Sequence, residues 1–374
     1  MIVHIITGLG RGGAEHTLYR LLTQEPDPLR TRIVSLTNGG VFQPRLEALG
    51  FEVACLGMRR GVPSPLKWWR LVCLLRSWRP SLVQTWMYHA DLLGGLAALF
   101  AGVPVCWGVR HSDLSRRSNK ASTLVAARMC ALVSRWLPTR AISCSMRAVS
   151  IHRAFGYSVP FSVVPNGIDA QAWKPRPEMR ASIRAELHLP EEVFTLAHAG
   201  RNDPQKDHVT LARAFNRLYA LRPEVRLILC GEGLSPGHVY FESLPFSAYS
   251  RTAVLALGAR DDLAMLWQAA DVFVLSSCGE GFPNAVAEAM ACGLPVVVTD
   301  VGDTAEIVGE AGAVVPPSDP EALAGAMFDM VAMDSDSRLL LGVAARNRVQ
   351  SRFTVERMSA GFRRVWDEVL TEKG

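Results

Sequence analysis

The feature that most constrains this chain is a repeated alternation of short β-branched runs with amphipathic stretches. Such alternation is typical of βαβ units, because neighbouring parallel strands need a crossover that covers one face of the sheet. A polar, proline-bearing stretch at 171–178 interrupts the pattern once, since it cannot continue a helix or a central strand. We therefore predict an α/β protein of two Rossmann-like, doubly wound parallel-sheet domains that face each other across a cleft.

The 374 residues, 49% of them apolar, suit two domains. We expect an N-terminal domain at 1–170, a linker at 171–178, a C-terminal domain at 179–352, and a last helix at 353–374 that packs back on the N-terminal domain. The expected strands of the first half are Ile2–Thr7, Arg32–Thr37, Phe51–Cys55, Leu82–Thr85, Val103–Val109, Thr139–Ser143 and Phe161–Val164. Those of the second are Phe194–Ala199, Arg226–Cys230, Ala253–Leu257, Val272–Leu275, Pro295–Thr299 and Ala313–Val315.

Charge divides unevenly between the two halves. Residues 1–185 hold 24 Lys and Arg against 9 Asp and Glu, a net charge of +15, whereas residues 186–374 carry a net charge of −10. A basic half suggests an anionic partner such as a membrane face, a nucleic acid or a phosphorylated substrate, although plain solvation charges would look the same. The eight cysteines lie at least fourteen residues apart, which excludes a metal knuckle and favours a reducing compartment. We expect a cytoplasmic protein with neither a signal peptide nor a membrane span.

The first candidate site is the glycine loop Gly8–Gly13, which follows the first expected strand and precedes a helix. Small residues allow backbone N–H groups to approach a phosphate, and the helix N-terminus adds its positive dipole end. The glycines also fit a dinucleotide fingerprint, but that pattern needs a carboxylate at the end of strand two, where this chain has Leu36-Thr37-Asn38. Anion binding and a purely structural tight turn both remain open.

The second candidate follows the first expected strand of the second half, as Gly200-Arg201-Asn202-Asp203-Pro204-Gln205-Lys206. Ligands of doubly wound sheets bind beyond the carboxyl ends of the strands. Arg201 and Lys206 would thus bring two cations to one crevice, where they could stabilise a departing nucleoside diphosphate without a metal. A solvated loop with an Arg201–Asp203 pair is the alternative.

The third and most specific candidate runs from Glu280 to Glu288 through Gly281, Phe282, Asn284 and Ala285. Two carboxylates at different depths of one crevice can each accept hydrogen bonds from a pair of sugar hydroxyls, one on a hexose and one on a ribose. Pro283 suits the first position of the helix, so the N–H groups of the next two residues could bind the phosphate between the sugars. An ordinary capped helix with exposed acids is the alternative.

Together these motifs resemble glycosyltransferase family 4, the retaining group 1 enzymes of the GT-B fold, over nearly the whole chain. The family pattern E-x7-E is present as Glu280 to Glu288. Supporting motifs are Gly10-Arg11-Gly12-Gly13-Ala14-Glu15, Val164-Pro165-Asn166-Gly167-Ile168-Asp169, Gly200-Arg201 with Lys206, and Gly302-Asp303-Thr304-Ala305-Glu306-Ile307-Val308.

The resemblance implies a role for each matching residue. Arg201 and Lys206 would grip the donor diphosphate, Glu288 the ribose, and Glu280 the transferred sugar. Gly12 and Gly13 would close over the phosphates, Asn166 would contact substrate, and His111 occupies the position where the family often has a histidine beside the donor sugar. Pro283 replaces a common glycine and removes one expected N–H contact, while 231–250 leaves the base-side wall undefined.

The implied activity is retaining transfer of a hexose-type sugar from a UDP-sugar or GDP-sugar to a saccharide or lipid-linked acceptor in polysaccharide or glycolipid synthesis. The departing phosphate would assist acceptor deprotonation, and neither a cofactor nor a metal is required. Two other functions stay open: a sugar-nucleotide-binding scaffold, and another GT-B activity such as an epimerase. A phosphorylase should show a cofactor-binding lysine motif that we do not find, and nucleic-acid binding lacks any recognised motif.

The basic half contains a segment suited to a lipid interface. Residues 59–79 combine three tryptophans and six basic residues with no acid, and a second basic stretch runs from Arg116 through Lys120 towards Arg128, Arg135 and Trp136. Trp and Arg on a helix surface suit the edge of an anionic bilayer. The apolar residues of these helices could equally pack on the sheet. We expect reversible, peripheral contact with the inner face of the cytoplasmic membrane.

Overall fold

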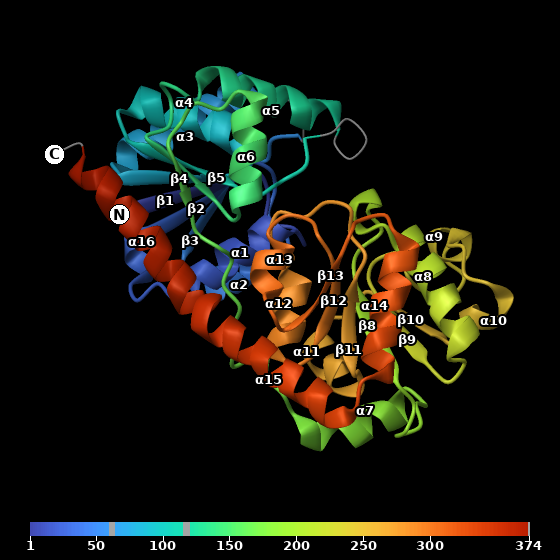
Figure 1. The fold of residues 1–374 in the computed structure, drawn as a ribbon. Helices are drawn as coiled ribbons and strands as arrows, with labels where there is room; N and C mark the ends of the chain where they lie inside the picture. The colour runs from blue at the N-terminus through green and yellow to red at the C-terminus, as the bar shows by residue number, and fades with distance from the viewer. Residues whose placement is uncertain (60–63, 115–119, 373–374) are drawn as a thin grey trace. The chain divides into compact units, whose positions relative to one another are not determined.

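The computed structural model describes residues 1–59, 64–114 and 120–372, and it divides the chain into two compact units (Figure 1). The first unit consists of Met1–Gly167 with Val355–Gly374, and the second of Ile168–Thr354. The sequence break at 171–178 thus lies a few residues inside the second unit. Arg60, Arg116 and Arg117 of the basic segments lie outside the described residues.

The first unit is a seven-stranded parallel sheet in the order β3-β2-β1-β4-β5-β6-β7. Its strands are β1 Ile2–Ile6, β2 Thr31–Ser35, β3 Glu52–Cys55, β4 Leu82–Trp86, β5 Val105–Val109, β6 Arg140–Ser143 and β7 Phe161–Val163. Its helices before the chain leaves the unit are α1 Gly13–Leu22, η1 Pro28–Arg30, α2 Phe42–Ala48, α3 Pro65–Trp78, α4 Tyr88–Ala101, α5 Ala121–Val133 and α6 Met146–Phe155. The order is that of a Rossmann sheet extended by one strand, as predicted.

Alternate side chains of the strands serve two separate cores. Val3, Ile5 and Val34 face a layer that includes α3, α4 and α5, while Ile6 and Ile33 face α1 and α2. The last helix, α16 Val355–Thr371, closes the second layer with residues such as Phe362, and Trp366 Nε1 donates to Gln84 Oε1 of β4 at 3.0 Å. The chain therefore ends on the unit in which it began.

The second unit has a six-stranded parallel sheet in the order β10-β9-β8-β11-β12-β13. The strands are β8 Thr195–Ala199, β9 Arg226–Cys230, β10 Val254–Gly258, β11 Val272–Leu275, β12 Val296–Thr299 and β13 Gly312–Val315. The helices are η2 Pro177–Met179, α7 Arg180–Glu186, η3 Pro204–Lys206, α8 His208–Leu221, α9 Val239–Ser243, α10 Ala248–Arg251, α11 Leu263–Leu266, η4 Trp267–Ala269, α12 Asn284–Ala291, α13 Thr304–Val308, α14 Pro320–Ala332 and α15 Ser335–Arg352. This too is a Rossmann order, so both predicted sheets are confirmed.

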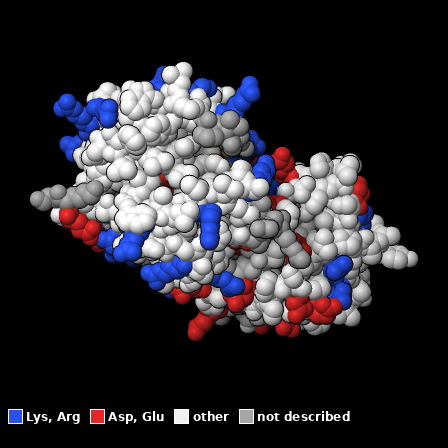
Figure 2. Space-filling model, turned by 90° about the horizontal axis from the view of Figure 1, so that it is seen from above, with Lys and Arg blue, Asp and Glu red and all other residues white. Residues whose placement is uncertain are grey.

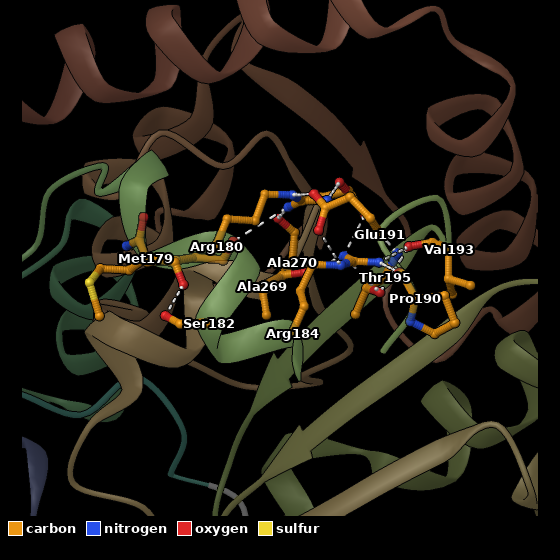
Figure 3. A network of polar contacts seen from close by, with 12 residues as sticks. Met179, Arg180, Ser182, Arg184, Pro190, Glu191, Val193, Thr195, Ala269 and Ala270 are labelled. Carbon is orange, nitrogen blue, oxygen red and sulfur yellow. Dashed lines mark hydrogen bonds and ion pairs between the residues drawn. The ribbon is translucent and has the colours of Figure 1, made fainter. Parts of the chain in front are cut away.

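A buried arginine anchors the strands of the second sheet at their starting ends (Figure 3). Arg184 of α7 is 1% exposed and donates to the carbonyls of Ala269 at 2.7 Å and Val193 at 2.5 Å. Arg180 bonds Asp271, just before β11, at 2.9 Å. The fold itself supplies partners for both guanidinium groups, although the buried Nε of Arg184 has no hydrogen-bond partner among the described residues. They also lie at the opposite strand ends from the loops where a doubly wound sheet binds ligands.

Four buried histidines give the protein a pH-dependent stability. Burial lowers the pKa of His4 to about 3, the pKa of His152 and of His208 to about 4, and the pKa of His198 well below its usual value. In the unfolded chain a histidine takes up its proton near pH 6.5, so between that pH and about 4 the unfolded state binds more protons than the folded one. The free energy of unfolding should therefore be fully present above about pH 7 and fall as the pH drops towards 4.

Asp91 acts in the opposite direction because burial raises its pKa to about 7. The unfolded aspartate loses its proton near pH 4 while the folded one keeps it, so this residue lowers stability as the pH rises through that window. Together the buried histidines change the free energy of unfolding over this pH range by more than the single aspartate does. Urea unfolding at pH 7.5 and pH 5.0 should show the lower stability at pH 5.0, with a steeper difference in Asp91→Asn. Equal stability at both values would contradict this expectation.

Candidate functional site

The switch point of the second sheet lies between β8 and β11, the neighbouring strands from which the strand order runs outward in both directions. The loops that follow these two strands leave the same edge of the sheet, where doubly wound folds bind ligands. Cys278 N donates to Gln205 O and Ser276 Oγ to Lys206 O, both at 2.8 Å. The second and third candidate motifs therefore form one site.

An ion pair occupies the centre of this site. Lys206 Nζ lies 2.5 Å from Glu280 Oε1, which also accepts a hydrogen bond from Ser277 Oγ at 2.7 Å. The side chains are 20% and 12% exposed respectively, so the charges are largely shielded from water yet remain reachable. A cation and a carboxylate at such an edge can bind a phosphate and a sugar hydroxyl side by side.

Arg201 does not join this pair. Its side chain is 59% exposed, and Nη2 lies 3.3 Å from Asp203 Oδ2 within its own loop. This is the solvated pairing that the sequence left open as the alternative. The structure thus brings Lys206 and Glu280 together and holds Arg201 beside Asp203. An exposed pair of this kind is weak, so the arginine can change rotamer at a small cost in free energy.

Two glycines with positive φ fix the backbone of the loops. Gly231, with φ of 149°, follows β9, and a Cβ there would lie 1.9 Å from Gly200 O. Gly302, with φ of 58°, follows β12, and a Cβ there would lie 2.4 Å from Glu280 O. Any side chain at either position would displace a neighbouring loop of the site.

Helix α12 holds the rest of the third motif. The helix begins at Asn284, with Pro283 just before it at the N-cap, so the expected placement of the proline at the first helical position is wrong by one residue. Val286 N donates to Pro283 O at 3.0 Å, so only the amides of Asn284 and Ala285 precede this first bond of the helix. Glu288 is one turn further along.

The side chains of this motif differ in accessibility. Glu288 is buried, whereas Glu280 is half-buried. Gly281 is half-buried. Phe282 is buried with its ring centroid 5.8 Å from that of Phe353 and packs under the loop.

In the first unit, Gly12 and Gly13 open α1. Gly12 is the N-cap residue in extended conformation, and the carboxylate of Glu15 folds back over it, so a Cβ on Gly12 would lie 2.3 Å from Glu15 Oε2. An anion at Gly12 would require this acidic side chain to move. Around Gly13 no described heavy atom lies within 4 Å of a Cβ position, so this residue presents open backbone.

Asn166 and His111 lie near the carboxyl ends of β7 and β5. Arg110 Nη1 donates to Asn166 Oδ1 at 3.0 Å and to Val164 O at 3.3 Å. The guanidinium of Arg110 lies 5.2 Å from the ring centroid of Trp86 and 4.9 Å from that of Phe362. Asn166 is 6% exposed, so in this structure its amide oxygen serves the packing of the first unit. His111 is half-buried.

Sequence reasoning missed several residues that support the site. Ser276 and Ser277 bond the Lys206 backbone and the Glu280 side chain, and Thr299 Oγ1 donates to Ser277 O at 2.6 Å. A pair of serines directly after a buried strand was the available signal. Within the described part of the chain, no three His, Cys, Asp or Glu side chains gather in a way that could hold a metal ion.

Comparisons with known proteins agree with this architecture. Residues 2–172 match the model of Glycosyltransferase Family 4, and residues 193–332 match that of Glycosyl transferases group 1. The structure of HepE from Anabaena in complex with UDP and glucose superposes with a TM-score of 0.84 at 22% identity, covering 98% of this chain and 100% of that one. WaaG, a glycosyltransferase involved in lipopolysaccharide biosynthesis, superposes with a TM-score of 0.75 at 16% identity over 99% of both chains.

Curated relatives fall in the same class. The chain is 27% identical to the lipopolysaccharide core mannosyltransferase LpsB of Rhizobium meliloti over 87% of its own length and 92% of the relative's. It is also 27% identical to an Escherichia coli galactosyltransferase that uses UDP-Gal and a GlcNAc-diphosphoundecaprenol acceptor, over 61% of this chain and only 60% of that one. The chain thus spans less than two thirds of some relatives. It belongs to the group 1 family of glycosyltransferases, with the GT-B fold.

Proposed function

We propose that this protein transfers a hexose-type sugar, with retention of anomeric configuration, from a UDP-sugar or GDP-sugar to a saccharide or lipid-linked acceptor. The observation that carries this proposal is the contact between Lys206 and Glu280, 2.5 Å apart at the switch point of the second sheet. The names of relatives support the substrate classes, since HepE was solved with UDP and glucose and the E. coli enzyme uses a diphosphoundecaprenol acceptor.

In this mechanism Lys206 and Arg201 neutralise the charge that develops on the departing nucleoside diphosphate. Lys206 is already in place, whereas Arg201 swings from Asp203 when the anion arrives. The amides at the start of α12 add a positive dipole. Glu280 accepts hydrogen bonds from hydroxyls of the transferred sugar, and the deeper Glu288 accepts them from the ribose.

The acceptor hydroxyl would attack from the face that the diphosphate leaves. The new glycosidic bond forms as the old sugar–phosphate bond breaks, and the proton of the acceptor passes to the departing phosphate. This route retains the configuration without a dedicated protein base. Preorganised charges at the leaving group are worth about 100-fold or more in rate.

A thermal-shift screen with UDP-, GDP- and ADP-sugars would identify the donor, because a ligand that binds only the folded state raises the unfolding temperature. The stabilising donor is then incubated with lipid-linked and saccharide acceptors, and the anomeric configuration of the product is read by NMR. An inverted product would contradict retention. Isomerised donor without acceptor would indicate an epimerase, and stabilisation without any turnover would indicate a scaffold.

We also propose reversible contact of the first unit with an anionic membrane. The exposed side chains favour α5 over α3 as the helix that would contact the membrane. On α3, Trp68 Nε1 donates to Leu93 O and Trp78 lies under the guanidinium of Arg32, so of the three tryptophans only Trp69 is largely exposed, at 46%, together with Leu66 in the first turn. Exposed apolar side chains are instead concentrated on α5 and just beyond it, at Val125, Met129, Leu132 and Trp136.

The positive charge in this part of the chain favours contact with an anionic bilayer. From Arg59 to Arg135 the sequence contains twelve Lys and Arg against two acids, of which Asp91 is buried. Figure 2 shows Lys and Arg at the rim of a largely uncharged surface over the first unit. No helix among the described residues is long and apolar enough to cross a membrane. A cationic rim around apolar side chains suits shallow insertion between anionic headgroups.

Flotation with liposomes tests this contact. The double variant Leu132→Ala, Trp136→Ala should bind anionic vesicles several-fold less than the wild type, because it removes side chains that are 60% and 75% exposed. The matched control is Leu339→Ala, Leu340→Ala on α15, whose side chains are 66% and 69% exposed but lie on the second unit. Equal binding to neutral and anionic vesicles, or an equal loss in the control, would contradict the proposal.

A further inference from the structure

Two buried histidines lie directly beneath the loop that carries Arg201 and Lys206. His198 belongs to β8 and His208 is the first residue of α8, and they are 0% and 1% exposed. Their ring centroids are 5.0 Å apart with the planes at 80°. Because neither ring reaches the surface, neither can touch a substrate, and the mechanism proposed above uses neither.

Each ring is held at Nδ1 by a different neighbour. His198 Nδ1 lies 2.9 Å from Val274 O of β11, a contact in which the ring must donate. His208 Nδ1 lies 2.9 Å from the hydroxyl of Tyr240 on α9. The two histidines therefore connect the loop after β8 to the neighbouring strand on one side and to α9 on the other.

The Nε2 atoms of both rings point to the same place under Gly200. A Cβ on Gly200 would lie 3.0 Å from His198 Nε2, 3.2 Å from His208 Nε2 and 3.2 Å from Lys206 Cγ. Both Nε2 atoms are buried; that of His198 has no hydrogen-bond partner among the described residues, whereas His208 faces the backbone of Gly200, whose hydrogen bond raises the pKa of the imidazole against the larger effect of burial. A buried unsatisfied nitrogen costs about 1–3 kcal/mol, so His198 gives up part of the stability that its contact with Val274 contributes.

The two rings also determine the position of the Gly200–Lys206 loop. The carbon stem of Lys206 and both rings surround the Cβ position of Gly200, so the rings determine the height of Gly200 above β8 and the point from which the Lys206 side chain extends to Glu280. Burial keeps the pKa of both histidines low, so they are neutral at pH 7 and do not repel Lys206. A shift of about 1 Å at such a group costs on the order of 100-fold in rate.

We propose that His198 and His208 are positioning residues that hold the Gly200–Lys206 loop at the height at which Lys206 meets the diphosphate of the donor. This inference rests on the proposed function and names what places its central cation. Through its contact with Tyr240, His208 also connects α9, which lies in the segment 231–250, to the same loop.

The test compares His208→Leu, which loses the contact with Tyr240, with His208→Asn, whose amide can still accept from the Tyr240 hydroxyl. Calorimetry measures the binding of UDP and UMP, and of GDP and GMP, to each variant. His208→Leu should weaken the diphosphate about 10-fold and the monophosphate less than about 2-fold, because the second phosphate is the one that needs Lys206 in place. His208→Asn should lie closer to the wild type.

Equal weakening of diphosphate and monophosphate, or no weakening in a variant that is less stable to urea, would overturn the inference, because a purely structural residue would give these results. If His208→Leu does not fold, Tyr240→Phe removes a single hydroxyl and should show a smaller loss confined to the diphosphate. A wild-type protein that binds neither UDP nor GDP would instead overturn the proposed function and this inference with it.

Discussion

Replacing Lys206 with alanine should lower kcat about 100-fold or more and raise the KM for the donor by a smaller factor. The amine meets charge that grows on the diphosphate as the sugar departs, so its contribution is larger in the transition state than in the bound donor. The variant also leaves the 12% exposed carboxylate of Glu280 without its cation, 2.5 Å away in the wild type. That unpaired charge should disturb the sugar pocket as well.

Steady-state kinetics with the donor found in the thermal-shift screen measure this effect. Lys174→Ala is the matched control, because Lys174 is an exposed lysine of the same unit outside the site. A double variant with Glu280→Gln should lose little more than Lys206→Ala alone, since the two side chains act as a unit. Full turnover in Lys206→Ala, or strictly additive losses in the double variant, would refute the assigned role.

Gly302→Ala should lower kcat about 10- to 100-fold although residue 302 itself contributes no side chain to the site. A Cβ there would lie 2.4 Å from Glu280 O and 2.9 Å from Gly281 O, so the loop that carries Glu280 must move. A displacement of about 1 Å is enough for a loss of this size. The positive φ of 58° adds about 1–2 kcal/mol of backbone strain for any residue with a Cβ.

The variant Gly237→Ala is the control that separates the cost of positive-φ backbone strain from the effect of displacing the loop that carries Glu280. Gly237 has a comparable φ of 77° in the same unit, but no described heavy atom lies within 4 Å of its Cβ position. Urea unfolding should show a similar φ penalty in both variants, whereas only Gly302→Ala should lose turnover. Similar kcat values for the two would mean that the backbone of Glu280 does not need the position seen here.

The sheets were predictable because their signal is local. Runs such as Arg226–Cys230 and Val272–Leu275 are apolar, β-branched and bounded by turn residues, and the structure places both strands at these limits. The parallel, doubly wound arrangement followed from the βαβ pattern, because right-handed crossovers leave few arrangements open. Pro283 was placed one residue too far into its helix, the usual scale of error at a helix end.

Side-chain pairing was less predictable because it depends on which rotamers the assembled loops allow. From the sequence we could predict that Arg201 and Lys206 lie at the same edge of the second sheet. We could not predict that Lys206 bonds Glu280, 74 residues away, while Arg201 pairs with Asp203. The hydrogen bond from Arg110 to the amide oxygen of Asn166 was likewise not predictable. Such contacts involve segments far apart in the chain, and no local pattern encodes them.

The central claim is that a nucleoside diphosphate binds at the loops after β8 and β11, and two exposed cysteines allow a direct measurement. Cys278 lies in the β11 loop, with its N–H bonded to Gln205 O, whereas Cys73 lies on α3 of the first unit. Alkylation by a maleimide, followed by peptide mass spectrometry, reports both rates in one sample. Saturating UDP or GDP should slow alkylation of Cys278 several-fold and leave Cys73 unchanged. Unchanged alkylation of Cys278 while a nucleotide is demonstrably bound would place the ligand elsewhere and contradict the account.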